Sequence, residues 1–95
     1  MAIRVFVKRK VSDRDINALR VHIDQLRILS SGQPGYVSGE TLRRLDSPGE
    51  IMVISKWKTQ KDWARWFETP ERGRVQRQID ELLGEQTTYE IYDFD

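Results

Sequence analysis

The spacing of apolar residues switches between two periods along the chain, and this switching constrains the fold more than any other feature of the sequence. Alternating apolar positions from residue 3 predict a half-buried strand that runs to about Val11. Ser12, with Asp15 three residues later, resembles a helix capping box, and apolar residues then recur three or four positions apart, which predicts a helix over residues 13–30. The two patterns are carried by Ile3, Val5 and Val7, and then by Ile16, Leu19, Ile23 and Leu26.

The middle of the chain has the pattern of two strands joined by a turn. Two glycines and a proline within residues 31–35 predict a loop, and residues 36–45 then form a half-exposed strand. Residues 46–49, Asp-Ser-Pro-Gly, have the composition of a hairpin turn. Residues 51–54 are apolar at four successive positions, which predicts a third strand that is buried on both faces.

The last third of the chain predicts a helix in two segments, followed by a strand. Thr59 is a helix N-cap, and Thr69-Pro70 restarts the helix because proline suits its first position. An apolar stripe then continues to Leu83, and Gly84 ends the helix. Residues 87–94 form the last strand, with Tyr89 and Ile91 on one face and Tyr92 and Phe94 on the other.

These elements follow the order β-α-β-β-α-β, which is the ferredoxin-like, split βαβ arrangement. The predicted fold class is therefore α+β, with a four-stranded antiparallel sheet and both helical segments on one face. We find no repeat and no linker, so residues 1–95 are expected to form a single domain.

The predicted sheet has apolar side chains on the face that the helices leave uncovered. On the third strand, Met52 and Ile54 lie opposite Ile51 and Val53. A contiguous exposed apolar patch marks an interface, and a chain of this length buries only about 60–65% of its unfolded surface. We therefore expect a two-fold homodimer through the sheet face. The alternative is a sheet face that merely tolerates scattered apolar groups.

Composition excludes several classes of protein. The chain has no cysteine and one histidine, so neither a disulfide framework nor a histidine-rich metal site is expected. Sixteen basic and 15 acidic residues give a formal charge of +1, which argues against a nucleic-acid partner. No apolar run is long enough to span a membrane, and no signal-peptide pattern is visible, so a cytoplasmic location is expected.

The loop Pro34-Gly35-Tyr36, the segment Ile54–Trp66 (ISKWKTQKDWARW) and the following Thr69-Pro70 carry a resemblance to a known family. Together with the order of elements, they resemble the antibiotic biosynthesis monooxygenase domain, over essentially the whole chain. The resemblance implies a dimeric α/β barrel. It also implies oxidation of phenolic or quinol-type compounds by dioxygen without flavin or metal, so no cofactor is expected.

Other members of the superfamily degrade haem with an asparagine, a tryptophan and an iron-ligating histidine. Trp66 matches that tryptophan in position. The histidine position falls near Gln76 or Gln78, and the asparagine position falls near Val7. Neither glutamine supplies an imidazole for iron, so the resemblance disfavours haem degradation.

Three aromatic residues of one helical segment are the first candidates for the site. Trp66 is the catalytic candidate, because its indole N–H could hold a substrate oxygen while its ring walls a pocket. Trp63 and Phe67 are candidates for substrate binding. The alternative is that all three only pin the helix to the sheet, as aromatic residues at helical spacing usually do.

His22 and Tyr36 are the remaining candidates. His22 is the only imidazole and becomes a candidate general base if it faces a cavity between helix and sheet; otherwise it is a histidine at the solvent edge. Tyr36 follows a Gly-Pro loop and could lie at a pocket mouth. Tyr89 and Tyr92 are assigned to the dimer interface, where tyrosine is enriched.

The leading hypothesis is thus a cofactor-independent monooxygenase that acts on a small aromatic or quinol-type compound in an apolar pocket. A non-catalytic dimer of the same fold, either structural or binding a small molecule, is the alternative. A related isomerase would need an acid–base pair that only His22 and the carboxylates could supply. RNA recognition is disfavoured because residues 51–55 lack the aromatic side chains that stack on bases.

Overall fold

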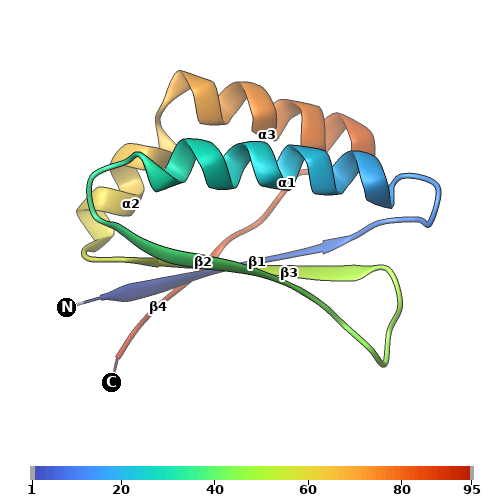
Figure 1. The fold of residues 1–95 in the computed structure, drawn as a ribbon, viewed down its shortest axis with the longest axis horizontal. Coiled ribbons are helices and arrows are strands. Elements are labelled where there is room, and N and C mark those ends of the chain that lie inside the picture. Colours follow the sequence, from blue (N-terminus) through green and yellow to red (C-terminus); the bar gives the residue numbers. More distant parts are fainter. Residues whose placement is uncertain (1, 95) are drawn as a thin grey trace.

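The computed structural model describes residues 2–94 and contains one sheet with helices on one of its faces (Figure 1). In chain order the elements are β1 (Ile3–Lys10), α1 (Ile16–Ser31), β2 (Tyr36–Arg43), β3 (Glu50–Trp57), α2 (Gln60–Phe67), α3 (Pro70–Leu83) and β4 (Glu90–Asp93).

The sheet is antiparallel throughout and has the strand order β2-β3-β1-β4. The two central strands pair along their whole length, from Ile3 opposite Trp57 to Lys10 opposite Glu50. One irregularity interrupts β2 between Tyr36 and Ser38. The predicted α+β, ferredoxin-like fold is confirmed.

Several elements differ in their bounds from the sequence prediction, among them α1 and β4 at their beginnings and β2, which ends at Arg43. Residues 13–15 form a turn, in which the Asp15 amide donates to the Ser12 carbonyl at 3.1 Å, so α1 begins three residues later than expected. β4 is four residues long instead of eight. Its expected beginning is not a strand, because the Thr87 amide donates to the Asp80 side chain at 3.2 Å instead of to a neighbouring strand.

The break between α2 and α3 falls where the sequence predicts it, although the Thr69 hydroxyl donates to the Trp66 carbonyl at 2.9 Å and does not cap α3. The Asp62 amide donates to Thr59 Oγ1 at 3.1 Å, which caps α2. Pro70 occupies the start of α3, and Gly84 ends that helix with φ of +70°. None of the described helices is long and apolar enough to cross a membrane.

The core lies between the sheet and the helices and consists of two adjoining clusters. One centres on β1 and the tryptophans of β3 and α2, and the other joins α1, β3 and α3. The core forms on this face because the side chains of β1 alternate between the two faces of the sheet. The odd-numbered side chains from Ile3 to Arg9 are all buried. Trp57, Leu19, Ile79 and Val5 are the largest fully buried side chains.

No helix or strand of residues 2–94 covers the opposite face of the sheet (Figure 1). By strand register, this open face carries apolar side chains from all four strands. Phe6 packs edge-on against Tyr92 with ring centroids 5.2 Å apart, and the Arg4 guanidinium lies 4.8 Å from the Phe94 ring centroid. We call the following residues the open-face stripe: Phe6, Leu42, Met52, Ile54, Tyr92 and Phe94.

Candidate functional site

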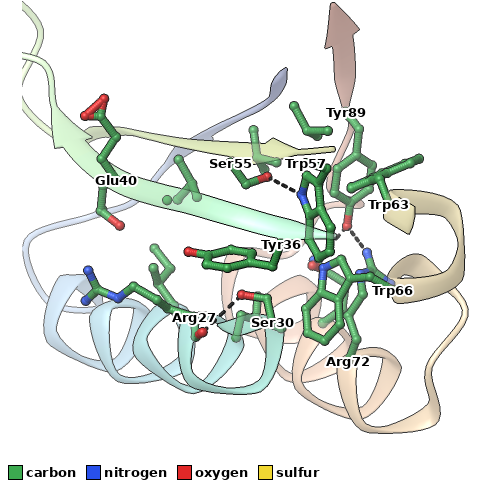
Figure 2. Close-up of a pocket in the computed structure, with 18 of the residues that line it drawn as sticks. Arg27, Ser30, Tyr36, Glu40, Ser55, Trp57, Trp63, Trp66, Arg72 and Tyr89 are labelled. Atoms are coloured by element: carbon green, nitrogen blue, oxygen red, sulfur yellow. Dashed lines mark hydrogen bonds between the residues drawn. The ribbon is translucent and has the colours of Figure 1, made fainter. Parts of the chain in front are cut away.

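A cavity of about 80 Å³ lies between the helices and the covered face of the sheet (Figure 2). Its floor is formed by inward side chains of β1 and β3, including Val5, Val53 and Ser55. Leu26 and Ser30 of α1 form its opposite side. A group of buried polar side chains, which we call the polar end of the cavity, adjoins the tryptophans, since Tyr89 packs against Trp63 (Figure 2).

All three tryptophans of the chain line this cavity. The rings of Trp57 and Trp66 stack with centroids 6.2 Å apart, and Trp63 packs against Tyr89 at 5.9 Å. Tyr36 packs edge-on against Trp57 at 5.3 Å. Such pairs stabilise one another beyond the area that they bury, so these rings form a fixed aromatic wall.

Two glycines shape the backbone beside this wall. Gly35 has φ of +83°, and its carbonyl accepts a hydrogen bond from the Lys58 amide at 2.8 Å, which joins the loop before β2 to the end of β3. A Cβ on Gly39 would lie 2.6 Å from the Tyr36 hydroxyl. The Tyr36 ring can therefore lie across β2 only because residue 39 has no side chain.

The polar end of the cavity holds two buried arginines, Arg9 and Arg72, which are 5% and 7% exposed. Arg72 Nη2 donates to the Tyr89 hydroxyl, and Tyr89 in turn donates to Gln76 Oε1 at 3.0 Å. Arg9 Nη2 donates to the same Gln76 oxygen at 3.4 Å. Gln76 Oε1 thus links the two arginines, since it accepts from Arg9 directly and is connected to Arg72 through the Tyr89 hydroxyl.

A carboxylate outside the cavity orients this group. Gln76 Nε2 donates to Asp80 Oδ1 at 2.9 Å and to Thr87 Oγ1 at 2.7 Å, and the Thr87 hydroxyl also donates to Asp80 at 2.8 Å. The amide of Gln76 is therefore fixed with its carbonyl toward the arginines and its NH₂ toward the carboxylate. Asp80 itself does not line the cavity.

Burial alters the ionisation of two of these groups. Desolvation raises the pKa of Tyr89, although the nearby Arg72 and Arg9 act in the opposite direction. Desolvation lowers the pKa of Arg9, while Tyr89 and Asp80 oppose that change. Tyr89 consequently remains a neutral phenol near neutral pH and acts as a hydrogen-bond donor and acceptor, not as a base.

The family model described as antibiotic biosynthesis monooxygenase matches residues 2–78. The chain belongs to this family. No curated protein matches the chain significantly.

Solved structures show the same fold at low sequence identity. A conserved protein from Methanosarcina mazei is 18% identical with a TM-score of 0.91, over 100% of this chain and 94% of its own. Rv0793 from Mycobacterium tuberculosis is 16% identical with a TM-score of 0.87, over 100% and 96%. A variant of SnoaB, a cofactor-independent oxygenase from Streptomyces nogalater, is 14% identical with a TM-score of 0.81, over 98% and 92%.

The cavity is lined by three of the candidate residues that were inferred from the sequence: Trp66, Trp63 and Tyr36. Phe67 lies outside it, although the Arg72 guanidinium stacks 4.1 Å from its ring centroid. His22 also lies outside it, on α1, where its Nδ1 is 3.1 Å from Gln25 Oε1. The condition for a general-base role of His22, a position facing the cavity, is not met.

The polar end of the cavity was missed by the sequence interpretation. Tyr89, assigned to the dimer interface, lines the cavity because it precedes the shortened β4 and packs under α2 and α3. Arg9 had a visible signal, since it continues the odd-numbered inward positions of the first strand. Arg72 had none, because an arginine on a charged helix usually faces solvent, whereas Gln76 lies near the position that the resemblance assigns to the haem-branch histidine.

Of the two glutamines near the haem-branch histidine position, Gln76 lines the cavity and Gln78 is exposed. The amide of Gln76 is already engaged by Arg9, Tyr89 and Asp80. Residues 2–94 contain no group of three or more histidine, cysteine or carboxylate side chains placed to hold a metal ion.

Proposed function

We propose that this chain is a cofactor-independent monooxygenase that oxidises a small aromatic, quinol-type compound in the cavity. The observation that carries the proposal is an aromatic-walled cavity, with hydrogen-bond donors at one end, in a member of the antibiotic biosynthesis monooxygenase family. SnoaB, whose fold this chain shares, is a cofactor-independent oxygenase.

The chemistry that such a site supports depends on the substrate's own electrons. An electron-rich phenolate can pass an electron to dioxygen, after which the two radicals combine at a ring carbon. One oxygen atom is added at that carbon, the quinol is oxidised to the corresponding hydroxyquinone, and the second oxygen atom leaves as water with two of the quinol's hydrogens, so no external reductant is needed. The protein's share is to hold the ring, stabilise the phenolate and exclude water.

The residues divide these tasks by position. Trp63, Trp57 and Tyr36 hold the flat face of the ring. Trp66 adds a donor, because its Nε1 makes no hydrogen bond with any residue in 2–94 and is not among the buried unpaired atoms. Arg9 and Arg72 supply further N–H donors at the polar end, where a negatively charged group of the substrate would lie.

The test is oxygen uptake with hydroquinones, anthrones and related polyphenols, measured with an oxygen electrode and with product identified by mass spectrometry. We expect turnover above that of heat-denatured protein and incorporation of one atom of ¹⁸O from labelled dioxygen. Uptake no faster than with the denatured control, across the whole panel, would contradict the proposal.

One observation favours the second candidate function, a non-catalytic small-molecule-binding protein. No imidazole lines the cavity in the described part of the chain, and the carboxylate of Glu40 points away from it (Figure 2). Binding of an aromatic ligand does not need a base in the cavity, whereas deprotonation of a phenol by the protein does. Saturable ligand binding without oxygen uptake would select this alternative. The same lack of an acid–base pair disfavours an isomerase.

We further propose that a second copy of the chain covers the open face of the sheet. In the isolated chain Tyr92 and Phe94 are 54% and 58% exposed, and the open-face stripe crosses all four strands. A second copy related by a two-fold axis would bring the same apolar stripe against itself, as isologous interfaces do.

A further inference from the structure

The polar end of the cavity contains more positive charge than its surroundings neutralise. Arg9 and Arg72 are both at least nine-tenths buried, yet neither forms a salt bridge with any carboxylate of residues 2–94. Asp80 reaches them only through the amide of Gln76. A buried cation without a paired anion is costly, so such an arrangement persists where something else supplies the anion.

Hydrogen bonding shows the same shortage of acceptors. A guanidinium has five N–H donors, but Arg9 makes one hydrogen bond, at 3.4 Å, and its Nε is the one buried side-chain atom of residues 2–94 with no partner. Gln76 Oε1 already accepts from both Arg9 and Tyr89. Arg9 therefore lines the cavity with donors to spare.

The volume of the cavity limits which ligands can supply hydrogen-bond acceptors to Arg9. A buried water needs about 10–15 Å³ of cavity volume, so about 80 Å³ admits roughly five to eight waters and no body larger than a single ring. The walls beside this space are Trp57, Trp63 and Trp66, which favour a flat apolar body. A fused polycyclic ligand would require these side chains to move.

We propose that the polar end is a carboxylate-binding subsite, and that the substrate of this chain is a single-ring aromatic acid whose carboxylate binds Arg9 and Arg72. That the ligand is a substrate rests on the proposed function, whereas the existence of the carboxylate-binding subsite does not depend on turnover. A carboxylate fits because its two oxygens match the fork of a guanidinium and it is ionised at neutral pH. Its ring then lies against the tryptophans.

The alternative is that Arg9 is purely structural and ties β1 to α3 through Gln76. That reading predicts that removal of Arg9 destabilises the fold. The ligand reading predicts the opposite, because an apolar side chain at this buried position removes an uncompensated charge. The two readings are therefore separable by experiment.

The first measurement uses the wild-type protein and a matched pair of probes, benzoate and benzamide, which have the same shape and differ in charge. All three tryptophans line the cavity, so quenching of their fluorescence reports binding directly. We expect benzoate to bind about tenfold to a hundredfold more tightly than benzamide. Equal affinities, or no benzoate binding at millimolar concentration, would overturn the proposal.

The second measurement locates the charge. Arg9→Met is expected to abolish the preference for benzoate while the melting temperature stays equal or rises. Arg9→Gln, which keeps a donor toward Gln76, is expected to lose the preference as well and serves if the methionine variant fails to fold. Arg74→Met, at an exposed position of α3, is the control and should retain the preference. A benzoate preference that persists in a folded Arg9 variant would overturn the assignment.

These outcomes are separate from those that test the oxygenase. Benzoate-selective binding with no oxygen uptake by any phenol would leave the subsite in place and contradict the proposed function. Oxygen uptake with neutral quinols, together with equal binding of benzoate and benzamide, would do the reverse.

Discussion

The indole rings of Trp57 and Trp66 stack with their planes 24° from parallel, although one ends β3 and the other lies on α2. Trp57 Nε1 donates to Ser55 Oγ at 3.1 Å, so its polar atom is occupied. Trp66 Nε1 has no such partner among residues 2–94. Trp57 is therefore a wall, whereas Trp66 is both a wall and an available donor.

Replacing Trp66 separates these two roles. Trp66→Phe keeps an aromatic ring but removes the N–H, so we expect oxygen turnover to fall about tenfold, with stability lowered by about 1–3 kcal/mol because phenylalanine is smaller. Trp66→Ala leaves a cavity and should lower the free energy of unfolding by about 3–5 kcal/mol. Initial rates and urea denaturation measure the two effects.

His22→Gln is the matched control for that experiment, because His22 lies outside the cavity. We expect full turnover and an unchanged pH profile in this variant. A turnover loss comparable to that of Trp66→Phe would show that the imidazole acts on the reaction from outside the cavity.

A charge on the open face should separate the proposed dimer. Ile54 lies in the open-face stripe opposite Phe6, so Ile54→Glu would place a carboxylate in the interface. Sedimentation at micromolar concentration should show a dimer for the wild-type protein and a monomer for the variant. Ile28→Glu, at a position of α1 that is 73% exposed, should leave the dimer intact. A wild-type monomer of 11.2 kDa would refute the interface.

The buried phenol of Tyr89 should make stability fall at high pH. Its pKa is raised in the folded state above the ordinary value near 10, so the unfolded chain releases this proton first as pH rises. The contribution is fully present below about pH 10 and is lost as the pH increases further. Urea denaturation at about pH 9 and about pH 11 should show a smaller loss in Tyr89→Phe than in wild type.

The positive φ of Gly35 is a structural requirement of the site. A Cβ at this position would collide with the Asp62 side chain, which cannot withdraw without losing its hydrogen bond from Thr59 Oγ1, 2.9 Å long. We expect Gly35→Ala to lower the free energy of unfolding by about 1–3 kcal/mol and to weaken binding at the aromatic wall. Gly84→Ala has a similar φ but open space around it, and should cost only about 1 kcal/mol.

Local patterns were sufficient for the elements and their order. The alternation at Ile3, Val5 and Val7 and the helix starts after Thr59 and Thr69 depend only on near neighbours in the chain, so they can be recognised without the fold. Even there, local signals failed at two ends. Ser12 and Asp15 form a turn before α1, and Thr87 bonds to Asp80 instead of extending β4.

The sequence by itself determined the α+β fold, the apolar character of both sheet faces and the aromatic segment that contributes Trp63 and Trp66 to the cavity. Tertiary structure alone decided that Arg9, 67 positions before Gln76 in the chain, would share one acceptor with Tyr89. Hydrophobic burial is periodic and therefore visible in a sequence. The pairing of buried polar groups depends on which elements meet in space, so only the folded chain shows that two arginines face an aromatic cavity without a salt bridge to any carboxylate of residues 2–94.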